Sequence, residues 1–121
     1  MEKVRIGFDL GGTNMGAALV SGDGKIIFKS EGPTLGHETA ENVIGRMKGL
    51  IRECVKEAGR QNLELTAIGL GCPGLLDSDT GVVKFSPNLS HWHNVEIGRL
   101  ISEEFNIPVK IDNDVSLPIS T

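Results

Sequence analysis

Several features that would point to particular classes of protein are scarce or missing in this chain of 121 residues. No apolar run approaches the roughly 20 residues that a membrane-spanning helix needs. The net charge of −4 argues against a nucleic-acid-binding surface, which is usually strongly basic. The first residues enter a strand-like run without the pattern of a signal peptide, so nothing indicates export. We therefore expect a cytoplasmic protein that binds neither membranes nor nucleic acid.

Cysteine is also scarce, because the chain contains only Cys54 and Cys72. Cys54 falls on the apolar stripe of a predicted helix, and Cys72 follows an apolar strand-like run. Neither has the spacing of a zinc-finger framework or of another known cysteine site. We expect both to be buried free thiols, as is common in cytosolic proteins. A disulfide or a nucleophilic role is the alternative.

The residues that are present indicate a globular domain. Hydrophobic residues make up 39% of the chain and charged residues 23%, and the length suits one domain. Apolar periodicity predicts helices at about 39–58 and 95–105, and strands at about 3–9, 14–20, 25–30, 65–70, 82–85 and 108–111. The first three strands have hairpin spacing, and later strands follow helical crossovers. This order predicts an α/β fold with a mixed sheet, three antiparallel strands followed by parallel strands and flanking helices.

Capping and turn residues mark the ends of these predicted elements. Thr39 can cap the start of the long helix, and Gly59 fits the position just past its last turn. Asn94 is the predicted cap of the second helix. Gly32-Pro33 is expected to break the third strand, and residues 77–81 are expected to form a turn.

The segment from Asp9 to Asn14 reads Asp-Leu-Gly-Gly-Thr-Asn and joins two strand-like runs. A glycine-rich turn offers bare backbone N–H groups to an anion, and the carboxylate of Asp9 can hold a cation. A Rossmann fingerprint needs a helix directly after its glycines, and a phosphate-binding Walker loop needs a lysine that is missing here. A phosphate with a metal ion is therefore the predicted ligand pair, and an ordinary hairpin turn is the alternative.

Three segments of the chain, in order and at similar spacing, resemble the sugar kinases of the repressor, open-reading-frame and kinase (ROK) family. They are Asp9–Asn14, Gly69–Gly74 and Asp112–Asp114, and Pro87-Asn88-Leu89 followed by Trp92 adds a weaker match. The resemblance spans residues 4–115. It implies a ribonuclease-H-like (actin-like ATPase) fold and ATP-dependent phosphorylation of a hexose. In the bacterial glucokinases, which the chain resembles most, glucose becomes glucose 6-phosphate.

The resemblance also implies roles for individual residues. Asp114 would be the general base that takes the proton of the sugar hydroxyl. The sugar-binding residues would be Gly74, Asn88, Asn113 and Asp114. The ATP phosphates would meet Asp9, Gly11, Gly12, Thr13 and Asn14, with Asp9 next to the Mg²⁺. For each of these residues a purely local role in a turn after a strand is the alternative. His91 and His93 share a spacing that could ligate a metal, but no third ligand lies near them in the sequence.

Family kinases have two domains, and the segments of the second domain do not occur in this sequence. We therefore expect residues 1–121 to be the amino-terminal domain, with 116–121 as an atypical tail that reflects truncation, a frameshift or an engineered end. Such a chain should be a poor kinase alone and should self-associate through the surface meant for the missing carboxy-terminal domain. The alternatives are a ROK-type sugar-responsive transcriptional regulator, a non-catalytic sugar-binding domain and an actin-like interaction module. The regulators carry a helix-turn-helix ahead of this domain, for which the early first strand leaves no room.

Overall fold

The computed structural model of the protein describes residues 1–86 and 89–113. Within them the chain forms ten elements in the following order: β1 (Lys3–Leu10), β2 (Asn14–Ser21), β3 (Ile26–Pro33), α1 (Ala40–Arg60), β4 (Glu64–Gly71), β5 (Leu75–Asp77), β6 (Val82–Phe85), β7 (His93–Val95), α2 (Ile97–Phe105) and β8 (Val109–Asp112). Five strands form the main sheet in the order β3-β2-β1-β4-β8, and three short strands form a second sheet in the order β5-β6-β7.

The main sheet has the predicted mixed topology. β1, β2 and β3 pair antiparallel through two hairpins, and β1 pairs parallel with β4, which in turn pairs parallel with β8. A parallel pair needs a crossover connection, and α1 supplies the connection before β4. The carboxyl ends of β1, β4 and β8 consequently meet at one edge of the sheet, which is where open α/β sheets bind ligands.

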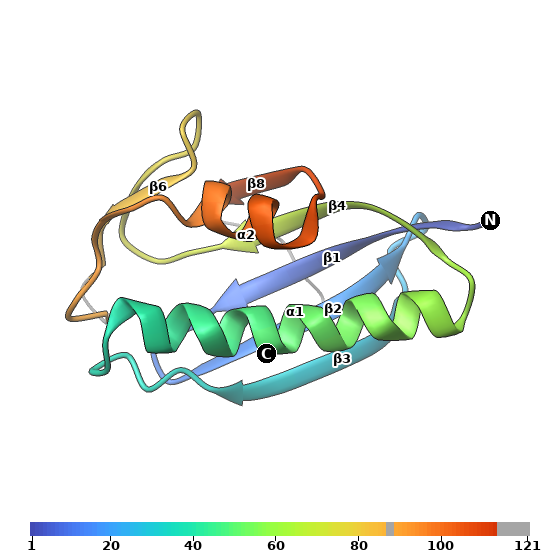
Figure 1. Ribbon diagram of the computed structural model, residues 1–121, viewed down its shortest axis with the longest axis horizontal. Coiled ribbons are helices and arrows are strands. Elements are labelled where there is room, and N and C mark those ends of the chain that lie inside the picture. The colour runs from blue at the N-terminus through green and yellow to red at the C-terminus, as the bar shows by residue number, and fades with distance from the viewer. Residues whose placement is uncertain (87–88, 114–121) are drawn as a thin grey trace.

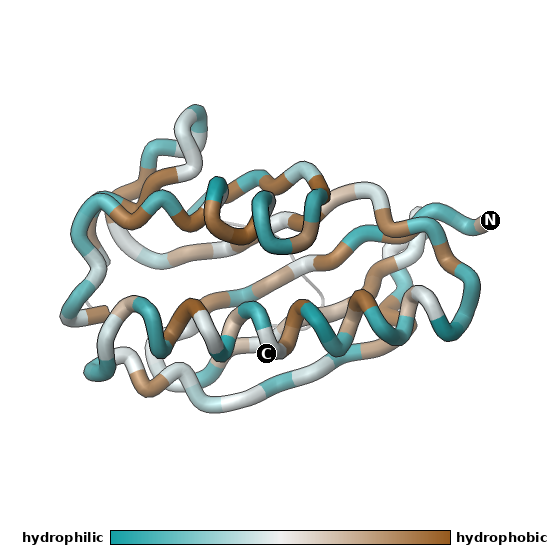
Figure 2. Tube along the Cα trace, viewed as in Figure 1, coloured by the Kyte–Doolittle hydropathy of each residue, from teal (hydrophilic) through white to brown (hydrophobic). Residues whose placement is uncertain are grey.

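Both helices lie on the same side of the main sheet, and the core lies between them and the strands (Figure 1). Alternation along β1 explains this arrangement, because Val4, Ile6, Phe8 and Leu10 are buried in that core. The long helix α1 contributes a buried stripe at helical spacing, and its outer face is polar (Figure 2). The odd-numbered residues of β1, including Asp9, project from the opposite face of the sheet.

The ends of the helices test the capping predictions. Thr39 does cap α1, since its hydroxyl accepts a hydrogen bond from the backbone N–H of Asn42 at 3.2 Å. The placement of Gly59 just past the helix was wrong, because α1 continues to Arg60 and Gln61 is its C-cap residue. The turn that follows uses a left-handed asparagine, Asn62 with φ 56°, rather than a glycine.

The prediction for the second helix was wrong at its start. Asn94 lies in β7 with a φ of 54°, and α2 begins two residues later than expected, at Ile97. Glu96 occupies the N-cap position and makes no side-chain capping bond. The short strands β5 and β7 were not predicted, because three-residue strands carry too little alternation to be recognised.

The third strand also continues further than predicted. Gly32-Pro33 does not break β3, because Pro33 still pairs with Asn14 at the end of the antiparallel ladder. β3 is an edge strand, and proline is tolerated there because it has no N–H to leave unpaired. The expected turn near 77–81 is present, with the side chain of Asp77 accepting from the backbone of Asp79 and Thr80.

Both cysteines are buried free thiols, as predicted. Burial raises the pKa of the Cys54 thiol to about 12, with a smaller contribution from the neighbouring Glu53 charge. Burial likewise raises the pKa of the Cys72 thiol to about 12, and the negative charge of Asp9 adds to the shift. In the part of the chain that the structure describes, no helix has the length and apolar character to cross a membrane.

Candidate functional site

Two acidic residues of the main sheet lie in one row on the face opposite the helices. Asp9 of β1 is in register with Gly71 of β4, and Gly71 is in register with Asp112 of β8. Neighbouring strands are roughly 4.8 Å apart, so the two aspartates are separated by about 10 Å across a glycine that has no side chain. Asp9 is half-buried and Asp112 is exposed. The two carboxylates therefore lie on the same face of the sheet, on either side of the buried Gly71.

The turn between β1 and β2 follows Asp9 directly. The N–H of Gly11 donates to the carbonyl oxygen of Asn14 at 3.0 Å, which closes the turn. A Cβ atom at Gly11 would lie 2.5 Å from that same oxygen, so only glycine fits there. Gly11 thus shapes the turn and does not offer its own N–H to a ligand, which refines the expectation of bare N–H groups along the whole segment.

The next two residues, Gly12 and Thr13, present their backbone to solvent. Both are exposed, and neither backbone N–H donates a hydrogen bond within residues 1–86 and 89–113. Successive backbone amides without partners at a tight turn can bind an anion. The structure therefore places Asp9 and the two free amides of Gly12 and Thr13 along one short segment, with Asn14 exposed beside them.

Asn113 connects the end of β8 to the loop that follows β4. Its side-chain nitrogen donates to the carbonyl oxygen of Gly74 at 2.7 Å and to that of Cys72 at 3.3 Å. The backbone N–H of Cys72 in turn donates to the carbonyl oxygen of Asp112 at 2.9 Å. The amide nitrogen of Asn113 is thus committed to backbone, and within residues 1–86 and 89–113 its oxygen accepts no hydrogen bond.

Gly74 has a conformation and a packing that only glycine allows. Its φ is 99°, and a Cβ atom there would lie 2.1 Å from the carbonyl oxygen of Phe85 and 2.8 Å from the Cα atom of Ser86. The loop after β4 therefore packs directly against the end of β6, where the Asn88 segment begins. Asn88 and Asp114, the predicted sugar ligand and general base, lie outside the described residues, as do 116–121.

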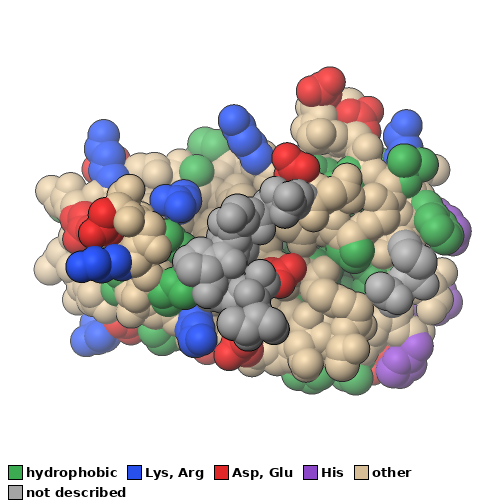
Figure 3. Space-filling view, turned by 180° about the vertical axis from the view of Figure 1, so that it is seen from behind, with side chains coloured by type: hydrophobic (Ala, Val, Ile, Leu, Met, Phe, Trp, Pro, Cys, Tyr) green, Lys and Arg blue, Asp and Glu red, His purple; other side chains and the backbone are tan. Residues whose placement is uncertain are grey.

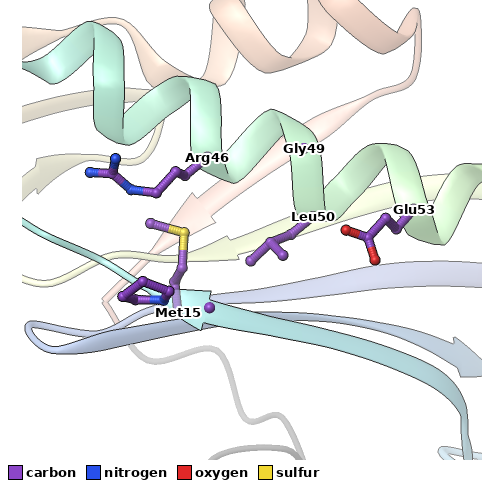
Figure 4. A pocket seen from close by; sticks show the side chains of 7 residues that line it. Met15, Arg46, Gly49, Leu50 and Glu53 are labelled. Carbon is purple, nitrogen blue, oxygen red and sulfur yellow. The ribbon is translucent and has the colours of Figure 1, made fainter.

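Two of the hollows in the molecule are lined entirely by described residues. One, of about 610 Å³, is lined by Gly69, Ser78, Asp79, Val109, Lys110, Ile111 and Asp112 and is largely polar. The other, of about 250 Å³, lies between α1 and the start of β2, where Arg46 and Glu53 flank Met15 and Leu50 (Figure 4). The first has Asp112 in its lining but not Asp9, so it meets only one end of the aspartate row.

The histidines gather at one end of the molecule, on the right in Figure 3. His93 contacts the ring of Phe85 with 6.2 Å between ring centroids, and the exposed Leu75 pairs with Phe85 across the second sheet. Trp92 is fully buried and packs in the core. In the described ranges no three His, Cys, Asp or Glu residues converge on a metal-binding geometry.

Sequence reasoning missed one residue of the site. Thr34 is fully buried, lies 23 positions from the glycine turn and hydrogen-bonds to it. The only available signal was the Pro-Thr pair after a strand, which reads as an ordinary strand end. Its position depends on the β2–β3 pairing extending one residue beyond Pro33.

A sheet of three antiparallel strands extended by parallel strands, with a glycine turn after the first strand, defines an actin-like ATPase domain, and sugar kinases of known structure share this fold. The ROK family model matches residues 5–118. The chain therefore belongs to the ROK family.

Three comparisons with individual proteins place the chain further. It is 39% identical to a glucokinase of Thermotoga maritima, and the match covers 96% of this chain and 35% of that protein. It is 32% identical to a xylose repressor of Caldicellulosiruptor bescii, and the match covers 92% of this chain and 28% of that protein. A ROK hexokinase of Thermus thermophilus superposes with a TM-score of 0.77 at 32% identity, over 90% of this chain and 34% of that one. The chain thus spans about a third of the length of the curated relatives it matches.

Proposed function

We propose that the chain is the nucleotide- and sugar-binding amino-terminal domain of an ATP-dependent hexose kinase, with glucose as the substrate and glucose 6-phosphate as the product. The observation that carries the proposal is the row of Asp9, Gly71 and Asp112 beside the two outward amides of Gly12 and Thr13. The kinase relatives named above support it.

The phosphate half of the proposal rests on the chemistry of one turn. Phosphoryl transfer depends mainly on positioning and on neutralising charge, so fixed N–H donors next to a carboxylate are the expected parts. Gly12 and Thr13 would donate to phosphate oxygens, and Asp9 would lie next to the Mg²⁺. A bound Mg²⁺ would neutralise phosphate charge that the chain, with its net charge of −4, does not otherwise offset.

The sugar half of the proposal rests on the loop after β4. Gly74 brings backbone to the surface, and Asn113 holds that loop against the end of β8. The oxygen of the Asn113 side chain would accept from a hydroxyl, and Asp114, next in the sequence, would take the proton. Asn88 would complete the hydroxyl contacts. A positioned carboxylate base typically contributes about 10²–10⁴-fold to the rate.

A sugar-responsive regulator is the second candidate, because a xylose repressor is among the relatives. The Asp114 position is the sequence feature that favours a kinase, since a sugar sensor needs no base there. Because a repressor is among the relatives, the expectation that the chain binds no nucleic acid stays a prediction. The two candidates differ in whether a nucleotide occupies the glycine turn.

The test is a heteronuclear NMR titration of the 121-residue chain with Mg²⁺-ATP and then with glucose. We expect Mg²⁺-ATP to shift the amide signals of Gly12 and Thr13, and glucose to shift those of Gly74 and Asn113. The hairpin turn at Gly24, at the far end of β2, provides control signals that should stay in place. An Asp9→Asn variant should weaken the response to Mg²⁺-ATP and leave the response to glucose intact.

The outcome distinguishes the two candidates. A response to sugar at Gly74 without any response to nucleotide at Gly12 would contradict the kinase proposal and favour a sugar sensor. A response to neither ligand would contradict both. We also expect the isolated chain to phosphorylate glucose far more slowly than a full-length ROK kinase, because one domain cannot hold both substrates in line and exclude water.

A further inference from the structure

Thr34, which belongs to none of the recognised motifs, makes two hydrogen bonds to the glycine turn. The hydroxyl of Thr34 donates to the carbonyl oxygen of Gly11 at 2.8 Å, and its backbone N–H donates to the carbonyl oxygen of Thr13 at 2.9 Å. Thr34 therefore contacts both sides of the four-residue turn. It is also fully buried, so no water competes for these bonds.

An arginine on α1 holds Thr34 in turn. The carbonyl oxygen of Thr34 accepts from Nη2 of Arg46 at 2.8 Å and from Nε at 3.2 Å, and Arg46 also pairs with Glu38 at 2.8 Å. Figure 4 shows the Arg46 side chain extending from α1 at one end of the apolar hollow, away from Leu50 and Glu53. The hydrogen bonds thus tie the turn to the long helix.

We propose that Thr34 is a positioning residue of the phosphate site, which fixes the turn so that the amides of Gly12 and Thr13 face outward together. The inference rests on the proposed function for its ligand but not for its geometry. The carbonyl oxygens of Gly11, Thr13 and Asn14 each accept a hydrogen bond that fixes the turn. The amides of Gly12 and Thr13 donate none within the described residues. A donor pair is worth more to an anion when it is already oriented before binding.

The matched substitutions are Thr34→Val and Thr66→Val. Thr34→Val keeps the side-chain shape and the backbone bond to Thr13 but removes the hydroxyl donor. Thr66 supplies the control, because its hydroxyl also donates to a strand carbonyl, that of Val4 at 3.1 Å, at the other end of the sheet. Thr34→Ser restores a hydroxyl and should restore wild-type behaviour. Arg46→Met keeps the aliphatic stem and removes the guanidinium donors, so it loosens Thr34 without altering it.

Two measurements test the positioning role of Thr34 separately from the proposed function. Without ligand, hydrogen exchange at the amides of Gly11 and residue 34, which donate to the carbonyl oxygens of Asn14 and Thr13, should be faster in Thr34→Val than in wild type and unchanged in Thr66→Val. With Mg²⁺-ATP, the dissociation constant should rise roughly threefold to tenfold in Thr34→Val, the loss expected for one buried hydrogen bond. Thr66→Val should stay within about twofold of wild type, and the glucose response at Gly74 should be unchanged in both.

Each outcome decides a separate statement. Equal exchange rates and equal dissociation constants in Thr34→Val and Thr66→Val would overturn the positioning role. Faster exchange in Thr34→Val together with no nucleotide binding by wild type would show that Thr34 fixes the turn, and would contradict the proposal that the turn binds phosphate. If Thr34→Val does not fold, Arg46→Met is compared with wild type in its place. An Arg46→Met chain with wild-type exchange and wild-type affinity would then overturn the proposal.

Discussion

Replacing Gly74 with alanine should destabilise the protein far more than an ordinary surface glycine substitution. The residue is exposed, yet its φ of 99° lies in a region that L residues rarely adopt. A Cβ atom would also lie 2.1 Å from the carbonyl oxygen of Phe85, which is about 1 Å closer than a carbon and an oxygen normally approach. The substitution therefore combines backbone strain with a clash against another backbone segment.

The two contributions can be sized separately. A non-glycine residue at such a φ costs about 1–3 kcal/mol. The clash involves backbone on both sides, so β6 must move away from β5, and Leu75 and Phe85 are partners in that pairing. Losing two backbone hydrogen bonds of about 0.5–1.5 kcal/mol each brings the total cost to roughly 2–6 kcal/mol. For a domain of this size, that corresponds to a fall in Tm of roughly 8–24 °C.

Two other glycines isolate the parts of this sum. Gly24 has a φ of 88° with nothing within 4 Å of an added Cβ, so Gly24→Ala should show the strain alone, about 1–2 kcal/mol. Gly59 lies inside α1 with open space around it, so Gly59→Ala should raise stability by about 0.5–1 kcal/mol. Urea unfolding of the three variants measures the free energies. If Gly74→Ala is no less stable than Gly24→Ala, the close packing of the loop on β6 is refuted.

Two further predictions concern the thiols and the second sheet. The raised pKa values of Cys54 and Cys72 keep both thiols protonated in the folded state, so the free energy of unfolding should fall as pH rises from about 9 toward 12, where only unfolded thiols ionise. Native-state thiol labelling at pH 8 should accordingly be slow, and fast labelling would contradict their burial. Phe85→Ser should weaken self-association in sedimentation velocity, because Phe85 and Leu75 are exposed apolar residues paired on one sheet, 50% and 62% exposed respectively. Lys84 is exposed on the same strand, so Lys84→Ser is the control. Equal self-association of the two variants would exclude Leu75 and Phe85 as the self-association surface.

Much of the fold followed from the sequence because its signals were long. The stripe of α1 and the runs of β1, β2 and β4 each extend over enough residues for periodicity to identify them. The errors fell at places where a few residues decide the structure. Gly59 fits a helix end on propensity alone, but packing of α1 against the sheet carries the helix past it. Asn94 is a good cap by type and instead takes a left-handed conformation in β7.

The candidate site was predictable to a different degree. The resemblance located Asp9, Gly12 and Asn113 by motif, but it could not say which of their atoms are already used. The structure shows that Gly11 donates within the turn and that the Asn113 nitrogen donates to backbone. Thr34 carries no motif, because its contacts depend on the register of β2 and β3 near Pro33 and not on residue type.

These contacts share one physical consequence for the site. The parts that would touch ligand, the amides of Gly12 and Thr13 and the backbone at Gly74, are main-chain groups, whose positions depend on what holds the loops. Two side chains hold these loops: the buried Thr34 holds the first loop, and the exposed Asn113 holds the second. A main-chain N–H can be removed only by substitution with proline, which also restrains the backbone, whereas a supporting side chain can be altered without changing the backbone of the loop itself. The sharpest way to separate nucleotide binding from sugar binding in this domain is therefore to alter the supports, Thr34 for one and Asn113 for the other.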